Sequence, residues 1–447
     1  MSLPHNLHDW LSYIESLHPQ GAAGIELGLE RVSLVYVALG LSPKLPGVVV
    51  TIAGTNGKGS SVAMLEAIAL AAGVRVAAFT SPHLLRYNER VRINGVDAPD
   101  EAWIRAFARV EQARLDVALT YFEFGTLAAL LVMLEAAPEL MLLEVGMGGR
   151  LDAVNVVDAD AVLLTNVALD HVAMLGADRE AIGHEKAGVM RAGQIVVLAE
   201  SVPPASVLTQ ANRLGLMVGQ SLFQRDLAFT LDAQNAESWV WRGLVTGLPT
   251  HVLPQPALAG AHQRDNAAGV VMLVEALNAR GVLPATITQE HMAVGLGNVR
   301  HPGRLQRLPA KIPVWLDVAH NPAGVEAVAQ AMRDWPSQGR TLVVFAVLAD
   351  KDAQAMASLL AEEVDAWYLA SLRGVRGRSS EDLAQVLRAA NATQVFCIAA
   401  TEASPFLAYT HALRDARVGD RIFILGSFLC VTDVLEQLAQ NSSTNAV

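Results

Sequence analysis

The segment GTNGKGS at residues 54–60 carries the strongest chemical signal in the chain. It follows an apolar run at 47–53 and precedes a helical pattern at 60–72. The backbone N–H groups of such a glycine-rich turn and the helix N-terminus form an anion site, which a lysine can complete. The segment differs from the standard phosphate loop, because Ile52 stands five residues before Gly57 and Gly59 separates Lys58 from Ser60. We nevertheless expect a phosphate site here rather than a plain surface turn.

Polar side chains also follow other apolar runs. Glu144 ends a run at 140–145 and opens the glycine-rich segment EVGMGGRLD. His171 ends the segment TNVALDH, and Ser81 follows a run at 74–80. Such groups at one edge of a sheet can bind a metal ion or a phosphate. On the residues alone, Glu144 fits a salt-bridged turn equally well, and Ser81 fits a turn cap equally well.

Weaker signals come from the segments HEKAG at 184–188 and DVAHNP at 317–322. On the residues alone, Lys186 belongs to a solvated helix face. The polar groups of DVAHNP, which end an apolar run, suggest a nucleotide or substrate contact. Arg304 lies just upstream, in a position to reach ATP phosphates. The alternatives are a surface charge for Arg304 and a helix cap for Asp317.

The apolar runs predict the elements that must position these groups. Runs in the first part of the chain are apolar on both faces, as expected of parallel strands covered by helices. Helical patterns at 60–72, 125–136 and 264–280 accompany them, and 221–260 suggests an antiparallel flap. A second alternation of strands and helices begins after the breaker cluster HPGR. The predicted strands are 47–53, 74–80, 140–145, 161–167, 194–199, 313–318, 341–348, 366–371, 394–399 and 421–425.

These elements predict an α/β protein of two domains. We expect a P-loop-type ATPase domain at 1–300, with a mostly parallel sheet and the flap, and a Rossmann-like α/β domain at 301–447. The boundary is expected near 296–304, where closure of the two domains over ATP would exclude water.

Composition excludes several classes of protein. The 447 residues are 52% hydrophobic, with a net charge of −11 and a mean hydropathy of +0.33. This composition opposes intrinsic disorder, and the charge opposes non-specific nucleic-acid binding. The two cysteines cannot form a disulfide framework. We find no signal peptide and no apolar run long enough to span a membrane, so we expect a cytoplasmic protein.

Taken together, the segments resemble the folylpolyglutamate synthase family, within the Mur-type ATP-dependent amide ligases. The matches cover nearly the whole chain in order, although 221–260 matches no motif. They are GIELGLERV, GTNGKGS, TSPHL, YFEFGTLAA, EVGMGGRLDAVN, TNVALDH, HEKAGV, HQRDNA, HPGRLQ, DVAHNPAG and GSF.

The resemblance implies roles for individual residues. The predicted catalytic residues are Lys58, Glu144, His171 and Lys186. The predicted ATP contacts are Asn56, Gly57, Lys58, Gly59, Ser60, Asn266, Arg304 and Asp317. The predicted magnesium ligands are Ser81, Glu144, His171 and Lys186, the last as a carbamate. The predicted pterin and folate contacts are Gly28, Leu29, Glu30, Thr120, Tyr121, Phe122, Glu123, Leu151, Asp152 and Ala153. His320 and Ser427 match positions near ATP or glutamate.

The resemblance also implies an activity. A protein of this family joins L-glutamate to dihydropteroate or to tetrahydrofolate through an acyl phosphate, with ATP as co-substrate and Mg²⁺, two ions in all. The implied partners are these small molecules, neither nucleic acid nor membrane, and the implied state is a monomer. Two alternatives stay open: a Mur-type ligase acting on another carboxylate, and a nucleotide-binding switch that ligates nothing.

Overall fold

A computed structural model describes residues 3–444 except 19, 20, 22, 23, 25, 234, 236, 391, 393 and 398–403. Part of the GIELGLERV motif and the end of the predicted strand 394–399 therefore lie outside the described residues. The chain divides into two compact units. The first contains residues 1–257 and 264–300, and the second contains residues 258–263 and 301–447. Within the described residues, no helix is both long and apolar enough to cross a membrane.

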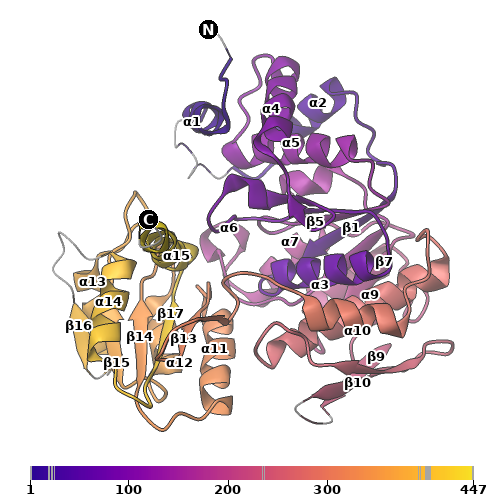
Figure 1. Ribbon diagram of the computed structural model, residues 1–447. Coiled ribbons are helices and arrows are strands. Elements are labelled where there is room, and N and C mark those ends of the chain that lie inside the picture. The colour runs from indigo at the N-terminus through magenta and orange to yellow at the C-terminus, as the bar shows by residue number, and fades with distance from the viewer. Residues whose placement is uncertain are drawn as a thin grey trace. The chain divides into compact units, whose positions relative to one another are not determined.

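An eight-stranded sheet, in the order β4-β3-β2-β5-β1-β6-β7-β8, forms the centre of the first unit (Figure 1). Strands β2, β5, β1, β6, β7 and β8 run parallel to one another. Strands β3 and β4 form an antiparallel edge beside β2. Every residue of β1 is buried, which fits a central strand covered on both faces. The strands are β1 (Val48–Ala53), β2 (Val76–Phe79), β3 (Val91–Ile93), β4 (Val96–Asp97), β5 (Leu140–Glu144), β6 (Ala161–Leu164), β7 (Ile195–Leu198) and β8 (Leu222–Gln224).

Helices of the first unit cover this sheet. Trp10, Trp103, Phe107 and Phe124 are buried in one core with side chains of β1, β2 and β5. Helix α3 contacts strands β1, β2 and β5 and also packs against helix α10. The helices are α1 (Leu7–Ser16), α2 (Glu30–Ala38), α3 (Lys58–Ala71), α4 (Asp100–Arg114), α5 (Tyr121–Glu135), α6 (Val172–Leu175), α7 (Arg179–Ala187), α8 (Ala205–Arg213), α9 (His262–Arg280) and α10 (Gln289–Asn298), with short 3₁₀ helices at Tyr87–Arg90 and Ala153–Val156.

The flap predicted at 221–260 is confirmed in part. Strands β9 (Phe229–Ala233), β10 (Ser238–Gly243) and β11 (Thr250–Pro254) form a separate antiparallel sheet. Residues Leu222–Gln224 instead extend the main sheet as β8, parallel to β7. The short run is buried on both faces, and burial of this kind favours parallel pairing over a place in a half-exposed flap.

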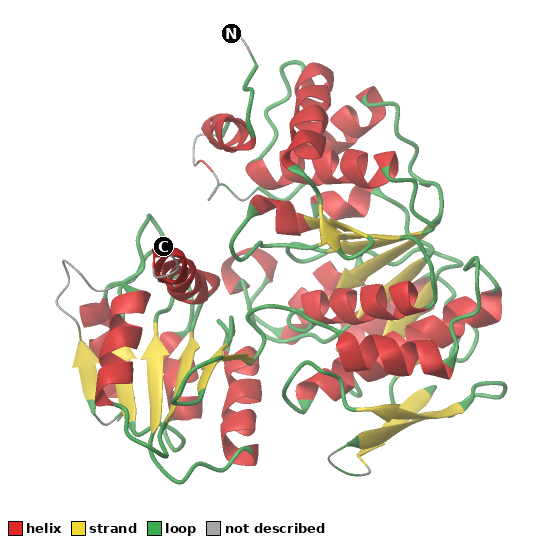
Figure 2. Cartoon of the chain, viewed as in Figure 1, coloured by secondary structure: helices red, strands yellow, loops and turns green. Residues whose placement is uncertain are grey.

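The second unit has a six-stranded sheet in the order β12-β13-β17-β14-β15-β16, with helices on both sides (Figure 2). Only β12 runs antiparallel among the described strands of this sheet. Helices α11, α12 and α13 share one core, while α14 and α15 pack together and against the strands. The elements are β12 (Gln306–Leu308), β13 (Val314–Leu316), β14 (Thr341–Phe345), β15 (Ala366–Leu369), β16 (Val395–Cys397), β17 (Arg421–Leu425), α11 (Pro322–Asp334), α12 (Ala353–Leu360), α13 (Ser380–Ala389), α14 (Pro405–Asp415) and α15 (Phe428–Thr444).

The turn between β1 and α3 leaves no room for side chains at two glycines. Gly54 has φ +145°, and a Cβ there would overlap the Thr165 hydroxyl. Gly57 has φ +84°, and a Cβ there would overlap the Asn266 amide. Glycine adopts these conformations without strain and lets the neighbouring backbone approach closely. The turn therefore depends on glycine at both positions.

A buried histidine ties the flap to the helices. His251 of β11 lies 3.0 Å from the amide oxygen of Gln289 in α10, through Nδ1, and 2.8 Å from a Glu275 carboxylate oxygen in α9, through Nε2. Burial opposes the charged ring, but the bonds to Glu275 and Gln289, with the nearby Glu290, raise the pKa of His251. Two acceptors at the two ring nitrogens favour the doubly protonated form.

Replacing Gly54 with alanine should destabilise the protein by more than about 2 kcal/mol, because the alanine would meet both the Thr165 hydroxyl and an unfavourable φ. Thermal unfolding measures the effect. Gly297→Ala is the matched control, since Gly297 lies in a helix with nothing near its missing Cβ. The control should be neutral or stabilised by up to about 1 kcal/mol. Equal unfolding temperatures for the two variants would contradict this account.

The His251 pair should stabilise the protein at acidic to neutral pH. Its folded-state pKa lies above the ordinary value of about 6.5. The contribution is therefore complete below that pH and is lost as the pH rises through the folded-state pKa. The wild type should exceed His251→Gln in unfolding temperature by more at pH 6 than at pH 9. A gap that stays constant over this range would contradict the charged pair.

Candidate active site

Polar segments gather at the carboxyl edge of the first unit's sheet. Strands β2, β5, β1 and β6 are consecutive neighbours in that sheet. Ser81 follows β2, Glu144 ends β5, the segment 54–60 follows β1, and the segment 165–171 follows β6. The carboxyl edge of an open α/β sheet is where ligands bind. The strand order therefore brings together segments that lie more than one hundred residues apart in the chain, such as 54–60 and 165–171.

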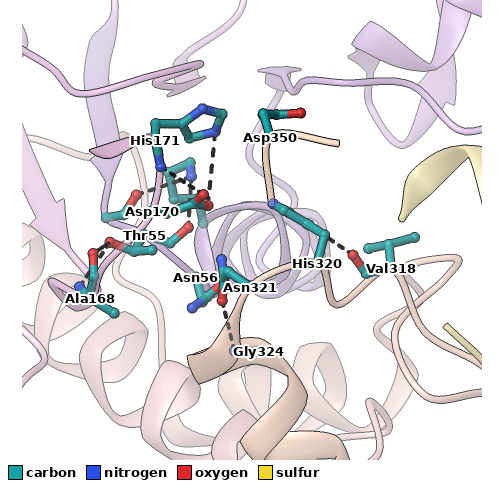
Figure 3. Close-up of polar contacts among 12 residues, drawn as sticks. Thr55, Asn56, Ala168, Asp170, His171, Val318, His320, Asn321, Gly324 and Asp350 are labelled. Atoms are coloured by element: carbon teal, nitrogen blue, oxygen red, sulfur yellow. Dashed lines mark hydrogen bonds and ion pairs between the residues drawn. The ribbon is translucent and has the colours of Figure 1, made fainter. Parts of the chain in front are cut away.

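The turn after β1 and the segment after β6 are joined by hydrogen bonds (Figure 3). The Thr55 hydroxyl accepts from the Ala168 N–H at 3.0 Å and donates to the Ala168 carbonyl at 3.1 Å. The Asn56 N–H donates to the Asn166 side chain at 3.0 Å. The Thr165 hydroxyl donates to the Asn56 carbonyl at 2.7 Å. These bonds fix the glycine-rich turn against its neighbour.

Two lysines share one backbone carbonyl in this turn. Lys58 Nζ donates to the Gly54 carbonyl at 3.0 Å and to the Thr55 carbonyl at 3.1 Å. Lys186 Nζ, from α7, donates to the same Gly54 carbonyl at 2.9 Å. Burial, followed by the Lys58 charge, lowers the pKa of Lys186 to about 7. The lysine that resembled part of a solvated helix face is therefore buried beside the glycine-rich turn.

Several predicted ATP residues lie around the same turn. Gly57 precedes the first residue of α3, which is Lys58, and Gly59 and Ser60 are buried in the first turn of the helix. Asn266, from α9, packs directly against Gly57. These residues form a helix N-terminus with a lysine at its start, an arrangement suited to a phosphate group.

The predicted metal ligands gather in part. The Ser81 N–H donates to Glu144 Oε2 at 3.1 Å, so these two residues are in contact. His171 has φ +49°, and its Nε2 lies 3.9 Å from an Asp170 carboxylate oxygen. Hydroxyl and carboxylate oxygens are the donors that Mg²⁺ prefers, so Ser81 and Glu144 fit that ion. Among the described residues, no cluster of three His, Cys, Asp or Glu side chains is arranged to hold a metal.

A cavity in the first unit contains most of the predicted pterin and folate contacts. It extends to Ser81 and Pro82, which follow β2. The Gly28 N–H donates to the Leu151 carbonyl at 3.2 Å and so joins two of its walls. The predicted residues that line the cavity are Gly28, Thr120, Phe122, Glu123, Leu151, Asp152 and Ala153.

Other predicted contacts lie elsewhere. Leu29 precedes α2, and Glu30 is exposed in its first turn. Tyr121 faces the Arg90 guanidinium, whose carbon lies 5.8 Å from the centre of the ring. Sequence reasoning missed Arg90 itself, which lines the cavity. Its place close after TSPHL, three residues from Tyr87, was the available signal.

The acids of this cavity are held by internal bonds. Asp152 accepts from the Met147 N–H at 2.8 Å and the Val154 N–H at 3.0 Å. Burial raises the pKa of Asp152 to about 6 although these bonds oppose the rise. Glu123 caps α5 by accepting from the Thr120 N–H at 2.7 Å, and it pairs with Arg31 at 3.1 Å.

The predicted residues of the second unit lie at its own sheet edge. Asp317 accepts from the Leu305 N–H at 2.8 Å and the Ala319 N–H at 2.7 Å, and burial raises the pKa of Asp317 against the nearby Arg304. Arg304 and His320 both contact Phe428, at 5.4 and 5.9 Å from the centre of its ring.

Local hydrogen bonds fix two segments of this edge. The His320 Nδ1 lies 2.9 Å from the Val318 carbonyl, and the Asn321 side chain caps α11 through the Gly324 N–H (Figure 3). The Ser427 hydroxyl donates to the Ala346 carbonyl at 2.9 Å and accepts from the Cys430 N–H at 3.1 Å. Ser427 therefore acts as a cap in the second unit.

Comparison with known proteins identifies similar sequences and structures. Residues 303–428 match the family model described as "Mur ligase, glutamate ligase domain". The dihydrofolate synthase/folylpolyglutamate synthase of Escherichia coli is 39% identical, over 96% of this chain and 95% of the relative. The structure of E. coli FolC in complex with DHPP and ADP has a TM-score of 0.87 at 37% identity, covering 98% of this chain and 99% of that one.

A second solved structure extends the comparison. It is a bifunctional folylpolyglutamate synthase/dihydrofolate synthase with Mn, AMPPNP and L-glutamate bound. Its TM-score is 0.84 at 39% identity, covering 97% of this chain and 98% of that one. Both comparisons extend over nearly the full length of this chain and of the relatives. The chain therefore belongs to the folylpolyglutamate synthase family of Mur-type ligases.

Proposed function

We propose that this chain is an ATP-dependent amide ligase, which joins L-glutamate to dihydropteroate and extends reduced folates with further glutamates. One observation carries the proposal. The cavity lined by the predicted pterin contacts extends to Ser81, and Ser81 bonds to Glu144 beside the strand that leads into the glycine-rich turn. An acid bound in the cavity can thus meet a phosphate bound at the turn.

The cavity suits a pterin. Phe122 offers an aromatic surface, and Asp152 offers a buried carboxyl group to the polar edge of the ring. The backbone bonds from Met147 and Val154 hold that carboxyl group in one orientation. A buried polar group in a binding site disfavours ligands that lack a matching hydrogen-bond donor or acceptor, because the group is then left unpaired.

The glycine-rich turn suits the triphosphate of ATP. Backbone N–H groups from Gly57 to Ser60 lie at the start of α3, and Lys58 can exchange its two backbone carbonyls for phosphate oxygens. We assign Mg²⁺ to Ser81 and Glu144, with His171 as a further predicted ligand. When bound, this ion would offset the negative charge of the phosphates. The E. coli relative with ADP bound and the relative with Mn and AMPPNP bound support the use of a nucleotide and a divalent cation. Arg304, Asp317, His320 and Ser427 remain predicted contacts.

The reaction then needs two substitutions. An oxygen of the substrate carboxylate attacks the γ-phosphorus of ATP, the bond from that phosphorus to the bridging oxygen breaks, and ADP leaves. The neutral amine of glutamate attacks the acyl carbon of the resulting acyl phosphate. The carbon–oxygen bond breaks, inorganic phosphate leaves, and the nitrogen loses a proton as the amide forms. The work of the protein is positioning and charge stabilisation, which needs no covalent nucleophile.

We further propose that Lys186 reacts with carbon dioxide. The ammonium group first loses a proton. The neutral amine nitrogen then bonds to the carbon of CO₂ and releases a second proton, so that a cation becomes an anion. Two ammonium groups on one carbonyl of the turn repel each other, and Lys186 is only 4% exposed. A carbamate would remove that repulsion and supply oxygen ligands for a cation.

Glutamate incorporation tests the activity. Purified protein with ATP should form an amide with dihydropteroate and, in a separate reaction, with tetrahydrofolate. Lys58→Ala should lose turnover by about 100-fold or more while it retains pterin affinity, because Lys58 acts on the phosphates and does not line the cavity. ATP hydrolysis that depends on neither pterin nor glutamate would support a nucleotide switch instead.

Lys186→Ala should lower turnover by about 100-fold or more, and acetate or propionate should restore part of it by supplying the missing carboxylate. Incubation with ¹³C-bicarbonate should give a carbamate signal in the wild type that the variant lacks. Lys44→Ala is the control, since the Lys44 side chain is 74% exposed and pairs with Asp160. Full activity in Lys186→Ala would remove the proposed role.

A further inference from the structure

Three arginines follow the segment TSPHL, and they differ in their partners. Arg86 pairs with Asp100 at 3.7 Å, and Arg92 pairs with Glu66 at 2.6 Å. Arg90 lies between them and is only 8% exposed, yet it contacts no carboxylate of the residues that the structure describes. A buried cation without an anion is unfavourable, so this arginine needs an explanation.

The acidic residue nearest to Arg90 in the sequence, Glu89, forms hydrogen bonds with backbone N–H groups. The Glu89 carboxylate accepts from the N–H groups of Leu84, Leu85 and Arg86 at 2.7–2.8 Å. Those three bonds hold the loop that follows TSPHL. Glu89 therefore stabilises the loop and does not pair with Arg90.

Arg90 is held in place by uncharged groups. Its Nε donates to His83 Nδ1 at 2.9 Å. Its guanidinium carbon lies 4.9 Å from the centre of the Tyr87 ring and 5.8 Å from that of Tyr121. Among the hydrogen bonds of the described residues, the Arg90 side chain donates only through Nε, and neither terminal nitrogen donates. The guanidinium group is thus held in one orientation, and the N–H groups of its two terminal nitrogens are available to a ligand.

These donors belong to the wall of the cavity. Arg90 lines it together with Ser81 and Pro82. The Arg90 carbonyl accepts from the Thr80 N–H at 2.9 Å, which places this arginine beside the end of β2. The two buried acids of the cavity are already bonded, Glu123 to Arg31 and Asp152 to backbone N–H groups. The cavity therefore presents a cation whose anion must come from a ligand.

We propose that Arg90 binds the carboxylate of the acid that enters the cavity, and so selects acids over their neutral esters or amides. The proposal rests on the proposed function, since that function supplies the acid. A guanidinium can bind one carboxylate with two parallel hydrogen bonds, which lysine cannot do. Each carboxylate oxygen keeps a second lone pair outside these bonds, so one of them can still attack phosphorus while Arg90 holds the group in one orientation.

Affinity for dihydropteroate and for its methyl ester tests the assignment, measured by titration calorimetry with a non-hydrolysable ATP analogue present. Arg90→Gln should weaken dihydropteroate binding by about 10- to 100-fold, the usual range for a hydrogen bond to a charged group. The ester should bind the variant and the wild type equally well. Arg90→Lys should fall between them for dihydropteroate, because it keeps the charge but loses the paired donors.

Arg86→Gln is the matched control, because it removes an arginine four residues away whose side chain is 70% exposed. It should leave both affinities unchanged. Equal losses for the acid and the ester in Arg90→Gln would show a structural role and overturn the proposal, as would unchanged affinity for the acid. A wild type that binds neither compound would instead overturn the proposed function.

A second pair of variants tests the orientation of the guanidinium. His83→Asn keeps an acceptor close to the position of Nδ1, whereas His83→Leu removes it. The asparagine variant should retain the preference for acid over ester, and the leucine variant should lose at least half of it. Identical preferences in the two variants would show that His83 does not orient Arg90.

Discussion

The carbonyl oxygen of Gly54 is the acceptor on which the first unit's site depends. Two lysine ammonium groups bond to it, one from α3 and one from α7. Those lysines can share it because Gly54 brings the backbone against Thr165, closer than any residue with a Cβ would allow. The bonds from Thr55 and Asn56 to the segment after β6 then lock this approach. Close packing of two strand ends thus sets where positive charge accumulates.

Several side chains at the site perform structural and proposed chemical tasks together. Asp152 and Asp317 each accept from two backbone N–H groups. Ser427 caps α15, and Glu123 caps α5. Backbone donors suit this purpose, because they satisfy a buried oxygen without adding a formal charge. A ligand can then meet a group that is already oriented, at little further cost in conformational freedom.

The sequence predicted the parallel strands and the glycine-rich turn, because runs such as 47–53 are apolar on both faces and the turn has its own residue pattern. It did not predict the β3–β4 edge or β12, since antiparallel strands of only two or three residues leave little periodic signal. Lys186 shows another limit. The polar residues around it in HEKAG predicted a solvated helix face. In the structure, the packing of α7 buries Lys186 beside the glycine-rich turn. Arg90 was missed for a similar reason, because its lack of an acidic partner is a property of three-dimensional packing.

The path of the chain constrains how the protein can be divided. Residues 258–263 belong to the second unit, although residues on either side of them belong to the first. The helix α9 therefore starts in one unit and continues in the other. A single cut after residue 300 would leave the first fragment with a piece of the second unit's packing and the second fragment without it. The two units are thus interleaved along the polypeptide and could not be exchanged between relatives at one crossover point.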